Sequence, residues 1–167
     1  MKDIIMDCDG QAARPAEPKP MGEIVYYPVG EDTPVYHGFG WGGNHKGADY
    51  KLPVGTPVKS MRDGKVIESA EDSKTYGRYL MVQHDDGYAS LYGHLSKLNK
   101  RKGDTVKGGE VIGLSGGAVG APGAGQTTGA HLHFEVRPPE MINYNWKAID
   151  PVKYIEAHRQ PKGGESE

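Results

Sequence analysis

The sequence contains a single cysteine, Cys8, among its 167 residues. One thiol cannot close an internal disulfide, and it excludes a structural zinc site built from several thiolates. No run of residues is long and apolar enough to span a bilayer, and the first residues, MKDIIMDCDGQ, carry acids where a signal peptide has its apolar centre. The formal net charge is only −2, which gives no reason to expect nucleic acid or an acidic membrane surface as a partner.

The length and composition favour one β domain. The chain is long enough for one hydrophobic core and too short for two comfortable domains. Short runs of β-forming residues recur along it, separated by turn pairs such as Asp63-Gly64 and Asp86-Gly87. These runs cover residues 23–29, 63–70, 78–84, 88–94, 110–115 and 131–137. Because long amphipathic stretches are absent, the pattern predicts a mainly antiparallel β domain, and the 25 glycines suit a fold made of hairpins.

The two ends of the sequence differ from the middle in composition. Residues 1–22 end in a stretch rich in Ala, Pro and charge, which predicts an irregular lead-in. A short helix is expected near the other end, where Asp150 can cap, Pro151 fits the first helical position and VKYIEAH follows. The polar tail, residues 159–167, is expected to be disordered, so the predicted domain covers residues 23–158.

Residues 129–136, GAHLHFEV, place two histidines one residue apart in an otherwise apolar run. On a strand, alternate side chains point to opposite faces, so His131, His133 and Glu135 share one face. The apolar residues between and after the histidines share the other face, which is suited to the core. The polar face of this strand therefore predicts a functional use.

A second polar pair, His45 and Asp49, lies in the stretch NHKGADY. The four-residue spacing places both on the same side of either an extended strand or a helix. Two histidines and a carboxylate are a ligand set of catalytic zinc sites, and imidazole suits Zn²⁺ better than Mg²⁺ or Ca²⁺. Spacing alone leaves an alternative open, in which the histidines are exposed to solvent and the glycine-rich segments before both motifs are only hairpin turns.

The other four histidines are interpreted as structural from the residues alone. His94 follows a strand-like run in YASLYGHLSKL, and His37, His84 and His158 have no partner at a meaningful spacing.

Three motifs, HKGADY, LYGHL and TGAHLHFEVR, occur in this order, and together they resemble the M23 family of zinc metallopeptidases, the LytM or lysostaphin-type peptidoglycan endopeptidases. The resemblance covers about residues 23–158 and includes DPVKYI, which is similar to the family's closing segment. It implies an antiparallel, sandwich-like β domain of the LytM type, with a groove that holds zinc at its floor and a short C-terminal helix.

The resemblance also implies a role for each residue of the motifs. His45, Asp49 and His133 would be the zinc ligands, His131 the general base, and His94 a second catalytic histidine that hydrogen-bonds the developing oxyanion. Glu135 has no ligand role in the family motif and is interpreted as structural.

Two segments are longer than the family pattern, the glycine-rich loop 115–129 and the segment 137–150. Both are expected to border the groove, where they would influence which substrate is preferred.

The resemblance therefore implies a zinc-dependent endopeptidase that hydrolyses peptide crosslinks of bacterial peptidoglycan. The alternative is a non-catalytic wall-binding module or an activator of other wall hydrolases, but all five motif positions are retained, which favours the enzyme. The expected partners are the peptide stems and crosslinks of the wall, without nucleic acid and without membrane insertion. Because no signal peptide is recognised, we expect a phage-encoded enzyme, which is carried with tail proteins in the virion or stays in the cytoplasm until lysis. A trimmed fragment of a larger secreted enzyme is the alternative.

Overall fold

The computed structural model describes residues 24–143 and 148–159. The expected lead-in and all but the first residue of the expected tail lie outside the described residues, as does Cys8. The described strands are β1 (Val35–His37), β2 (Ala48–Lys51), β3 (Pro57–Lys59), β4 (Gly64–Ser73), β5 (Gly77–His84), β6 (Ala89–Gly93), β7 (Leu95–Leu98), β8 (Thr105–Val106), β9 (Val111–Ser115) and β10 (His131–Arg137). The helical elements are the 3₁₀ helices η1 (Trp41–Gly43) and η2 (Pro139–Met141) and the helix α1 (Pro151–His158).

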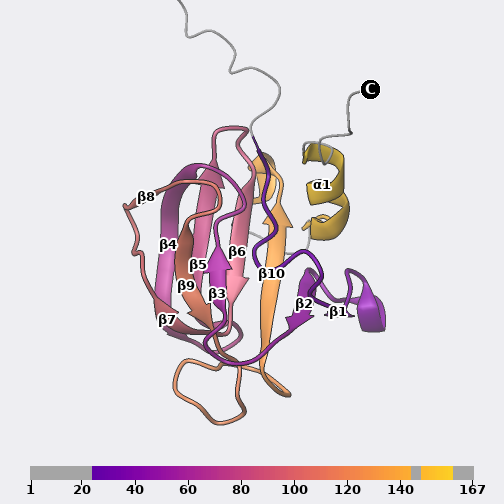
Figure 1. The fold of residues 1–167 in the computed structure, drawn as a ribbon, viewed down its shortest axis with the longest axis vertical. Helices are drawn as coiled ribbons and strands as arrows, with labels where there is room; N and C mark the ends of the chain where they lie inside the picture. The colour runs from indigo at the N-terminus through magenta and orange to yellow at the C-terminus, as the bar shows by residue number, and fades with distance from the viewer. Residues whose placement is uncertain (1–23, 144–147, 160–167) are drawn as a thin grey trace, which may run out of the picture.

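The strands form two sheets that lie one in front of the other (Figure 1). The larger sheet has the order β1-β2-β10-β6-β5-β4-β8, and the smaller has the order β3-β9-β7. Every paired strand runs antiparallel to its neighbour. The prediction of a mainly antiparallel β domain is therefore confirmed.

The main hydrophobic core fills the space between the two sheets. The larger sheet contributes Leu132, Phe134 and Val136 of β10, all fully buried, and the smaller sheet contributes Val58 and Ile112. These three residues of β10 are the apolar face that the alternation in GAHLHFEV predicted. Their burial fixes the direction of the opposite face of β10, which carries the two histidines.

Five of the six predicted strand runs form strands, and the run at 23–29 is wrong. Its described part, from residue 24, is not a strand, although Val25 and Val29 are buried in the core. The Tyr26 N–H donates to the Met61 carbonyl and the Pro28 carbonyl accepts from Lys59. Proline has no N–H to donate, so Pro28 interrupts a ladder that the alternating pattern alone would continue.

The predicted C-terminal helix is confirmed as α1. The Asp150 carboxylate accepts hydrogen bonds from the backbone N–H groups of Val152 and Lys153, and Pro151 occupies the first turn. Tyr154 and Ile155 are buried against the main core, so α1 closes one end of the layer between the sheets. No helix in the described ranges has the length and apolar character that crossing a membrane requires.

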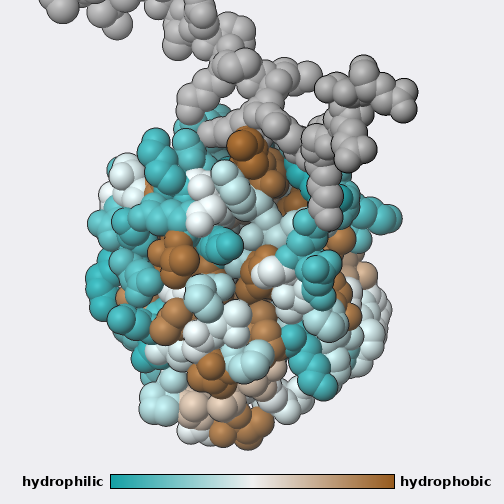
Figure 2. Space-filling view, in the orientation of Figure 1, coloured by the Kyte–Doolittle hydropathy of each residue, from teal (hydrophilic) through white to brown (hydrophobic). Residues whose placement is uncertain are grey.

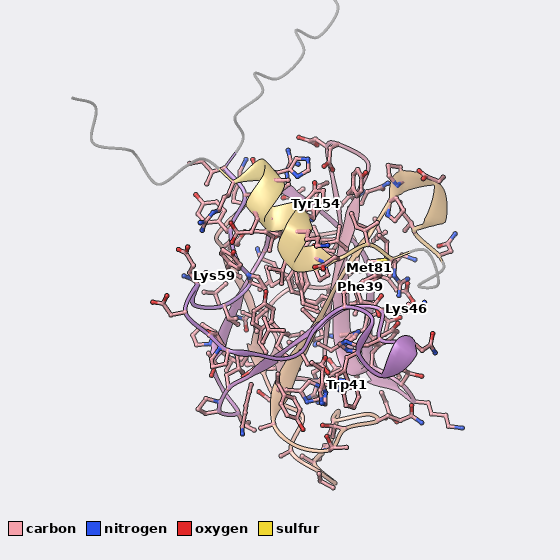
Figure 3. The ribbon with its side chains drawn as sticks, turned by 90° about the vertical axis from the view of Figure 1, so that its right-hand side faces the viewer. Phe39, Trp41, Lys46, Lys59, Met81 and Tyr154 are labelled. Atoms are coloured by element: carbon pink, nitrogen blue, oxygen red, sulfur yellow. The ribbon has the colours of Figure 1, made fainter. Side chains whose placement is uncertain are left out.

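The surface differs from one side of the larger sheet to the other. Figure 2 shows hydrophilic residues over the edge formed by β4 and β8, and a partly hydrophobic surface over the loop between β9 and β10, where Val119 is exposed. Large apolar side chains are also exposed around β1 and η1, namely Val35, Tyr36, Phe39 and Trp41. Figure 3 labels Trp41, the first residue of η1, and Phe39. Among the described residues, the exposed aromatic side chains other than Tyr26 thus gather at the β1 edge of the sheet.

Candidate metal centre

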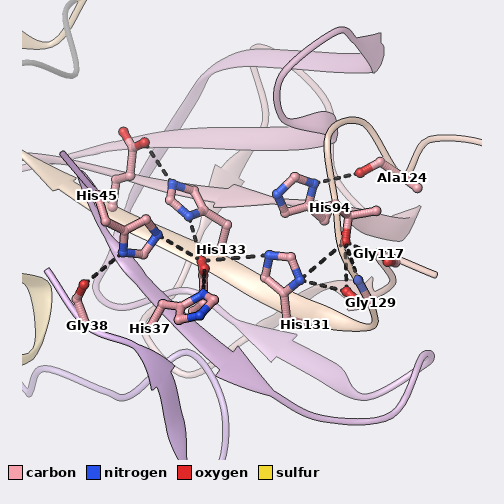
Figure 4. Close-up of polar contacts among 12 residues, drawn as sticks. His37, Gly38, His45, His94, Gly117, Ala124, Gly129, His131 and His133 are labelled. Carbon is pink, nitrogen blue, oxygen red and sulfur yellow. Dashed lines mark hydrogen bonds and ion pairs between the residues drawn. The ribbon is translucent and has the colours of Figure 1, made fainter. Parts of the chain in front are cut away.

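The carboxylate of Asp49 lies within 4 Å of a ring nitrogen of His37, His45, His131 and His133. Figure 4 labels these four histidines. In the sheet, Asp49 of β2 is the direct cross-strand partner of His133 on β10 and of His37 on β1. Its Oδ1 atom lies 2.8 Å from His133 Nδ1 and 3.2 Å from His45 Nε2. The larger sheet therefore brings together residues separated by 84 positions in sequence.

His45 reaches the cluster from a loop, not from the strand that carries Asp49. The chain bends between them at Gly47, where an added Cβ would lie 2.4 Å from the Phe134 carbonyl oxygen. Because real Cβ contacts are never that short, only glycine lets this bend pass so close to β10. We expected His45 and Asp49 to share one side of a regular strand or helix. A turn separates them instead, and it still brings the two side chains together.

His45, Asp49 and His133 together fit a metal ion. One ligand atom from each can be chosen so that all three lie within 4.8 Å of one another. His45 Nε2 is buried and has no hydrogen-bond partner among the described residues, while its Nδ1 donates to the Gly38 carbonyl at 2.9 Å. A buried nitrogen without a partner, aimed at a carboxylate, matches an imidazole whose other nitrogen is fixed by a carbonyl for metal binding. Two imidazoles and one carboxylate are a donor set suited to zinc.

Glu135, which we interpreted as structural, lies directly behind His133. Its Oε1 is 2.9 Å from His133 Nε2 and accepts a hydrogen bond from the Tyr76 hydroxyl at 2.8 Å. Its Oε2 accepts from the guanidinium of Arg137 at 2.9 Å, and both charged side chains are almost fully buried. Glu135 is therefore placed to orient the His133 ring, as carboxylates behind metal-binding histidines do.

His131 lies on the same face of β10 as His133, with Nε2 at 3.7 Å from Asp49 Oδ1. Its Nδ1 is 2.7 Å from the carbonyl oxygen of Gly129, to which it donates. The hydroxyl of Thr127 lies within hydrogen-bond distance of the Gly117 and Gly129 carbonyls and braces this loop. The loop thus fixes the His131 ring with Nε2 toward Asp49.

His94 lies at the junction of β6 and β7 and packs against His131, with ring centroids 4.7 Å apart. Its φ of 58° is positive, which is unusual for a residue with a side chain and marks a strained position. Its N–H donates to the Tyr76 carbonyl at 2.7 Å, and its Nδ1 donates to the Ala124 carbonyl at 2.6 Å. The contact with Ala124 fixes the ring through Nδ1 and does not involve Nε2.

The protonation of the cluster follows from its burial and its close charges. Burial alone would raise the pKa of the Asp49 carboxyl, but His133 and His45 outweigh it and hold that pKa well below its ordinary value. Burial also opposes the charged form of His133, yet the carboxylates of Asp49 and Glu135 raise its pKa to about 9. Burial lowers the pKa of His94 to about 4. In the metal-free protein at neutral pH, His133 is therefore protonated and His94 is neutral.

These residues line one side of a cleft of about 830 Å³. Trp41, Asn44 and Lys46 of η1 and the loop after it line the cleft, as do residues 126–128 of the glycine-rich loop. The expectation that loop 115–129 borders the groove is confirmed. The same expectation for segment 137–150 is wrong for its described residues, none of which lines the cleft, because Arg137 and Ile142 pack behind the site.

The structure adds residues that the sequence did not single out. His37, interpreted as structural, lines the cleft with Nδ1 at 3.4 Å from Asp49 Oδ2. Tyr76 stacks on the His133 ring at 5.7 Å between centroids. Neither has a spacing signal, because each comes from a different strand or turn. His84 and His158 lie elsewhere, hydrogen-bonded to Ser90 and to the Tyr154 carbonyl, respectively.

Comparison with known proteins gives one family. The chain matches the model of Peptidase family M23 over residues 43–151. It is 37% identical over 117 residues to the glycyl-glycine endopeptidase ALE-1 of Staphylococcus capitis, which covers 70% of this chain and 30% of that protein. The catalytic domain of lysostaphin from Staphylococcus simulans has a TM-score of 0.60 at 33% identity, covering 79% of this chain and 89% of that one. The catalytic domain of the prophage-encoded M23 protein EnpA from Enterococcus faecalis has a TM-score of 0.55 at 26% identity, covering 90% and 97%.

The chain spans less than a third of the length of the curated relatives that it matches first. The match nevertheless covers the three motifs, the cleft-lining residues from Asn44 onward and the helix cap, and the lysostaphin catalytic domain shares the fold. The resemblance drawn from HKGADY, LYGHL and TGAHLHFEVR is confirmed. The chain belongs to peptidase family M23.

Proposed function

We propose that this chain is a zinc-dependent endopeptidase that hydrolyses peptide crosslinks of bacterial peptidoglycan. One observation carries the proposal: His45, Asp49 and His133 converge within 4.8 Å, and His131 Nε2 lies 3.7 Å from the same Asp49 oxygen. A three-residue donor set with an imidazole beside it is the arrangement that metal-assisted hydrolysis needs.

His45 Nε2, Asp49 Oδ1 and His133 Nδ1 are the atoms that would hold the zinc ion. When bound, zinc activates a water molecule and polarises the scissile carbonyl group. Loading requires that His133 gives up the proton on Nδ1, while its Nε2–H still donates to Glu135. The same hydrogen bond then keeps the ring in the orientation that the metal needs.

His131 is suited to act as the general base. Its Nδ1–H donates to the Gly129 carbonyl, so in the neutral ring the proton is on Nδ1 and Nε2 carries a lone pair. That Nε2 faces the Asp49 oxygen and can accept a proton from the attacking water. The protonated ring can then donate the proton to the leaving amine.

His94 is suited to a second acceptor role beside His131. Its Nδ1–H donates to the Ala124 carbonyl, and its low pKa keeps the ring neutral, so its Nε2 accepts hydrogen bonds at neutral pH. The role of hydrogen-bond donor to an oxyanion, implied by the family resemblance, therefore requires that His94 first gains a proton during the reaction.

The test is hydrolysis of purified walls by the full chain. ALE-1 is a glycyl-glycine endopeptidase by name, so walls with glycine bridges are the first substrate, and walls with direct crosslinks are the comparison. We expect released peptides from at least one wall type, loss of release in excess chelator and recovery when zinc is added. His158→Ala, which changes a histidine outside the cleft, should behave as the unchanged protein. Wall binding without peptide release would contradict the enzyme and support a non-catalytic wall-binding module. Release that persists in excess chelator would contradict the zinc-dependent mechanism.

We also propose delivery by a phage particle, which is supported by the likeness to the prophage-encoded protein EnpA over 97% of that chain. The chain should then be found by mass spectrometry in purified virions together with tail proteins. Its absence from virions of the same lysate would contradict this route.

A further inference from the structure

We propose that His37 is a positioning residue, which holds Oδ2 of Asp49 so that Oδ1 of the same carboxylate stays turned toward the metal. This inference depends on the proposed zinc site but not on wall hydrolysis.

The two oxygens of Asp49 face different partners. Oδ1 faces the two histidines proposed as zinc ligands, with His133 Nδ1 at 2.8 Å and His45 Nε2 at 3.2 Å. Oδ2 faces His37, whose Nδ1 lies 3.4 Å away. A carboxylate that binds a metal through one oxygen leaves the other in need of a donor, and a metal-binding carboxylate without one is free to turn.

The register of the sheet sets this contact. His37 on β1 and His133 on β10 are both direct cross-strand partners of Asp49, one on each side of β2. Neighbouring side chains at such positions lie within reach of one another on the same face. His37 is thus placed by backbone pairing with β2, directly after a shift in register between Val35 and His37.

Two aromatic rings hold the His37 ring in its orientation. Trp41 stacks on it with ring centroids 3.5 Å apart and 21° between planes, and Tyr36 lies on it at 3.8 Å and 32°. The residues Trp41 and Tyr36 are 59% and 50% exposed, whereas the side chain of His37 is 17% exposed. Large rings left this open to solvent gain little from burial, so their stacking on His37 points to a role in fixing that ring.

The experiment compares two variants with the unchanged full chain. His37→Phe keeps a flat ring for the stack but has no N–H donor, whereas His37→Asn keeps a donor near the position of Nδ1 but has no ring. Zinc affinity is measured by competition with a chromophoric chelator, and thermal unfolding of each metal-free protein checks the fold. His158→Ala is the control for loss of a histidine outside the cleft.

We expect His37→Phe to bind zinc about 10- to 100-fold more weakly, as is typical when a group behind a ligand is lost. His37→Asn should recover most of this loss and remain within about threefold of the unchanged protein. If His37→Phe does not fold, His37→Leu provides the same comparison without the donor. Equal zinc affinity in the donor-free variant and the unchanged protein would overturn the proposal, as would an equal loss in both variants.

The outcome is separable from that of wall hydrolysis. If the unchanged protein binds zinc but releases no peptide, the proposed activity fails, and the comparison of zinc affinities still decides the role of His37. If the unchanged protein binds no zinc, both proposals fail.

Discussion

Asp49 of β2 and His133 of β10 are direct cross-strand partners, and their side chains meet with Oδ1 and Nδ1 2.8 Å apart. The apolar residues of β10 that alternate with His133 are fully buried between the two sheets. A slip of one residue in register would turn His133 into that core, so the hydrophobic packing that stabilises the fold also holds the two ligands together.

The metal-free protein should be most stable near pH 6.5. The folded state keeps the His133 proton up to about pH 9, whereas the unfolded chain loses it near 6.5, so the free energy of unfolding should fall as pH rises between these values. His94 affects stability at lower pH. Its ring stays neutral in the folded state down to about pH 4, whereas the unfolded chain takes up the proton near 6.5, so the free energy of unfolding should also fall as pH drops from 6.5 toward 4. Urea unfolding of chelator-treated protein at a series of pH values measures both effects.

Single variants separate the two limbs of this profile. His133→Gln should make the fall between pH 6.5 and 9 shallower, with a smaller fall left by His45, whose pKa Asp49 also raises, and His94→Gln should flatten the profile between pH 6.5 and 4. An unchanged alkaline limb in His133→Gln would mean that the two carboxylates beside this ring do not raise its pKa.

Gly47→Ala should destabilise the protein by about 1–3 kcal/mol and weaken zinc binding, because the added Cβ would lie 2.4 Å from the Phe134 carbonyl oxygen. The bend between His45 and Asp49 must then move away from β10. Gly38→Ala is the matched control, since its Cβ would meet no atom within 4 Å. Chemical unfolding and chelator competition measure the two effects, and equal results for both variants would contradict the close approach at Gly47.

Arg137→Ala should cost up to about 3–5 kcal/mol of stability, because it leaves the buried carboxylate of Glu135 with His133 as its remaining charge partner. Arg101 offers a contrasting pair, since its side chain is 67% exposed where it meets Glu71. Arg101→Ala should cost less than about 1 kcal/mol. A similar cost for both variants in urea unfolding would show that the Glu135 charge does not depend on Arg137.

The sequence predicted the elements whose signal is local. The alternation in β10 gave the core face and the histidine face, and the Asp150-Pro151 pair gave the start of α1. The motif resemblance placed His45, Asp49, His94, His131 and His133 at one site, and the structure brings all five to one cleft. Their individual roles remain predictions, since they rest on the family pattern and on hydrogen-bond geometry.

Other features depend on pairing between distant segments and had no local signal. The contact of His37 with Asp49 exists only because β1 pairs with β2, and a three-residue strand leaves little alternation to detect. Similarly, the approach of Tyr76 to His133 depends on the turn between β4 and β5 folding over β10. The run at 23–29 failed for the opposite reason, because its alternating pattern gives burial without the ladder that Pro28 interrupts.

The central claim is that His133 holds the metal and His131 moves the proton, and zinc content measured together with wall lysis for two alanine variants tests it most directly. His133→Ala should lose zinc and activity together, because it removes one of three protein donors. His131→Ala should keep about one zinc per chain while its activity falls at least ~10²-fold, as expected for loss of a general base. Both should remain folded, since the buried apolar face of β10 is unchanged. Loss of zinc in His131→Ala with retention in His133→Ala would reverse the assigned roles, and zinc and full activity in both variants would contradict the site itself.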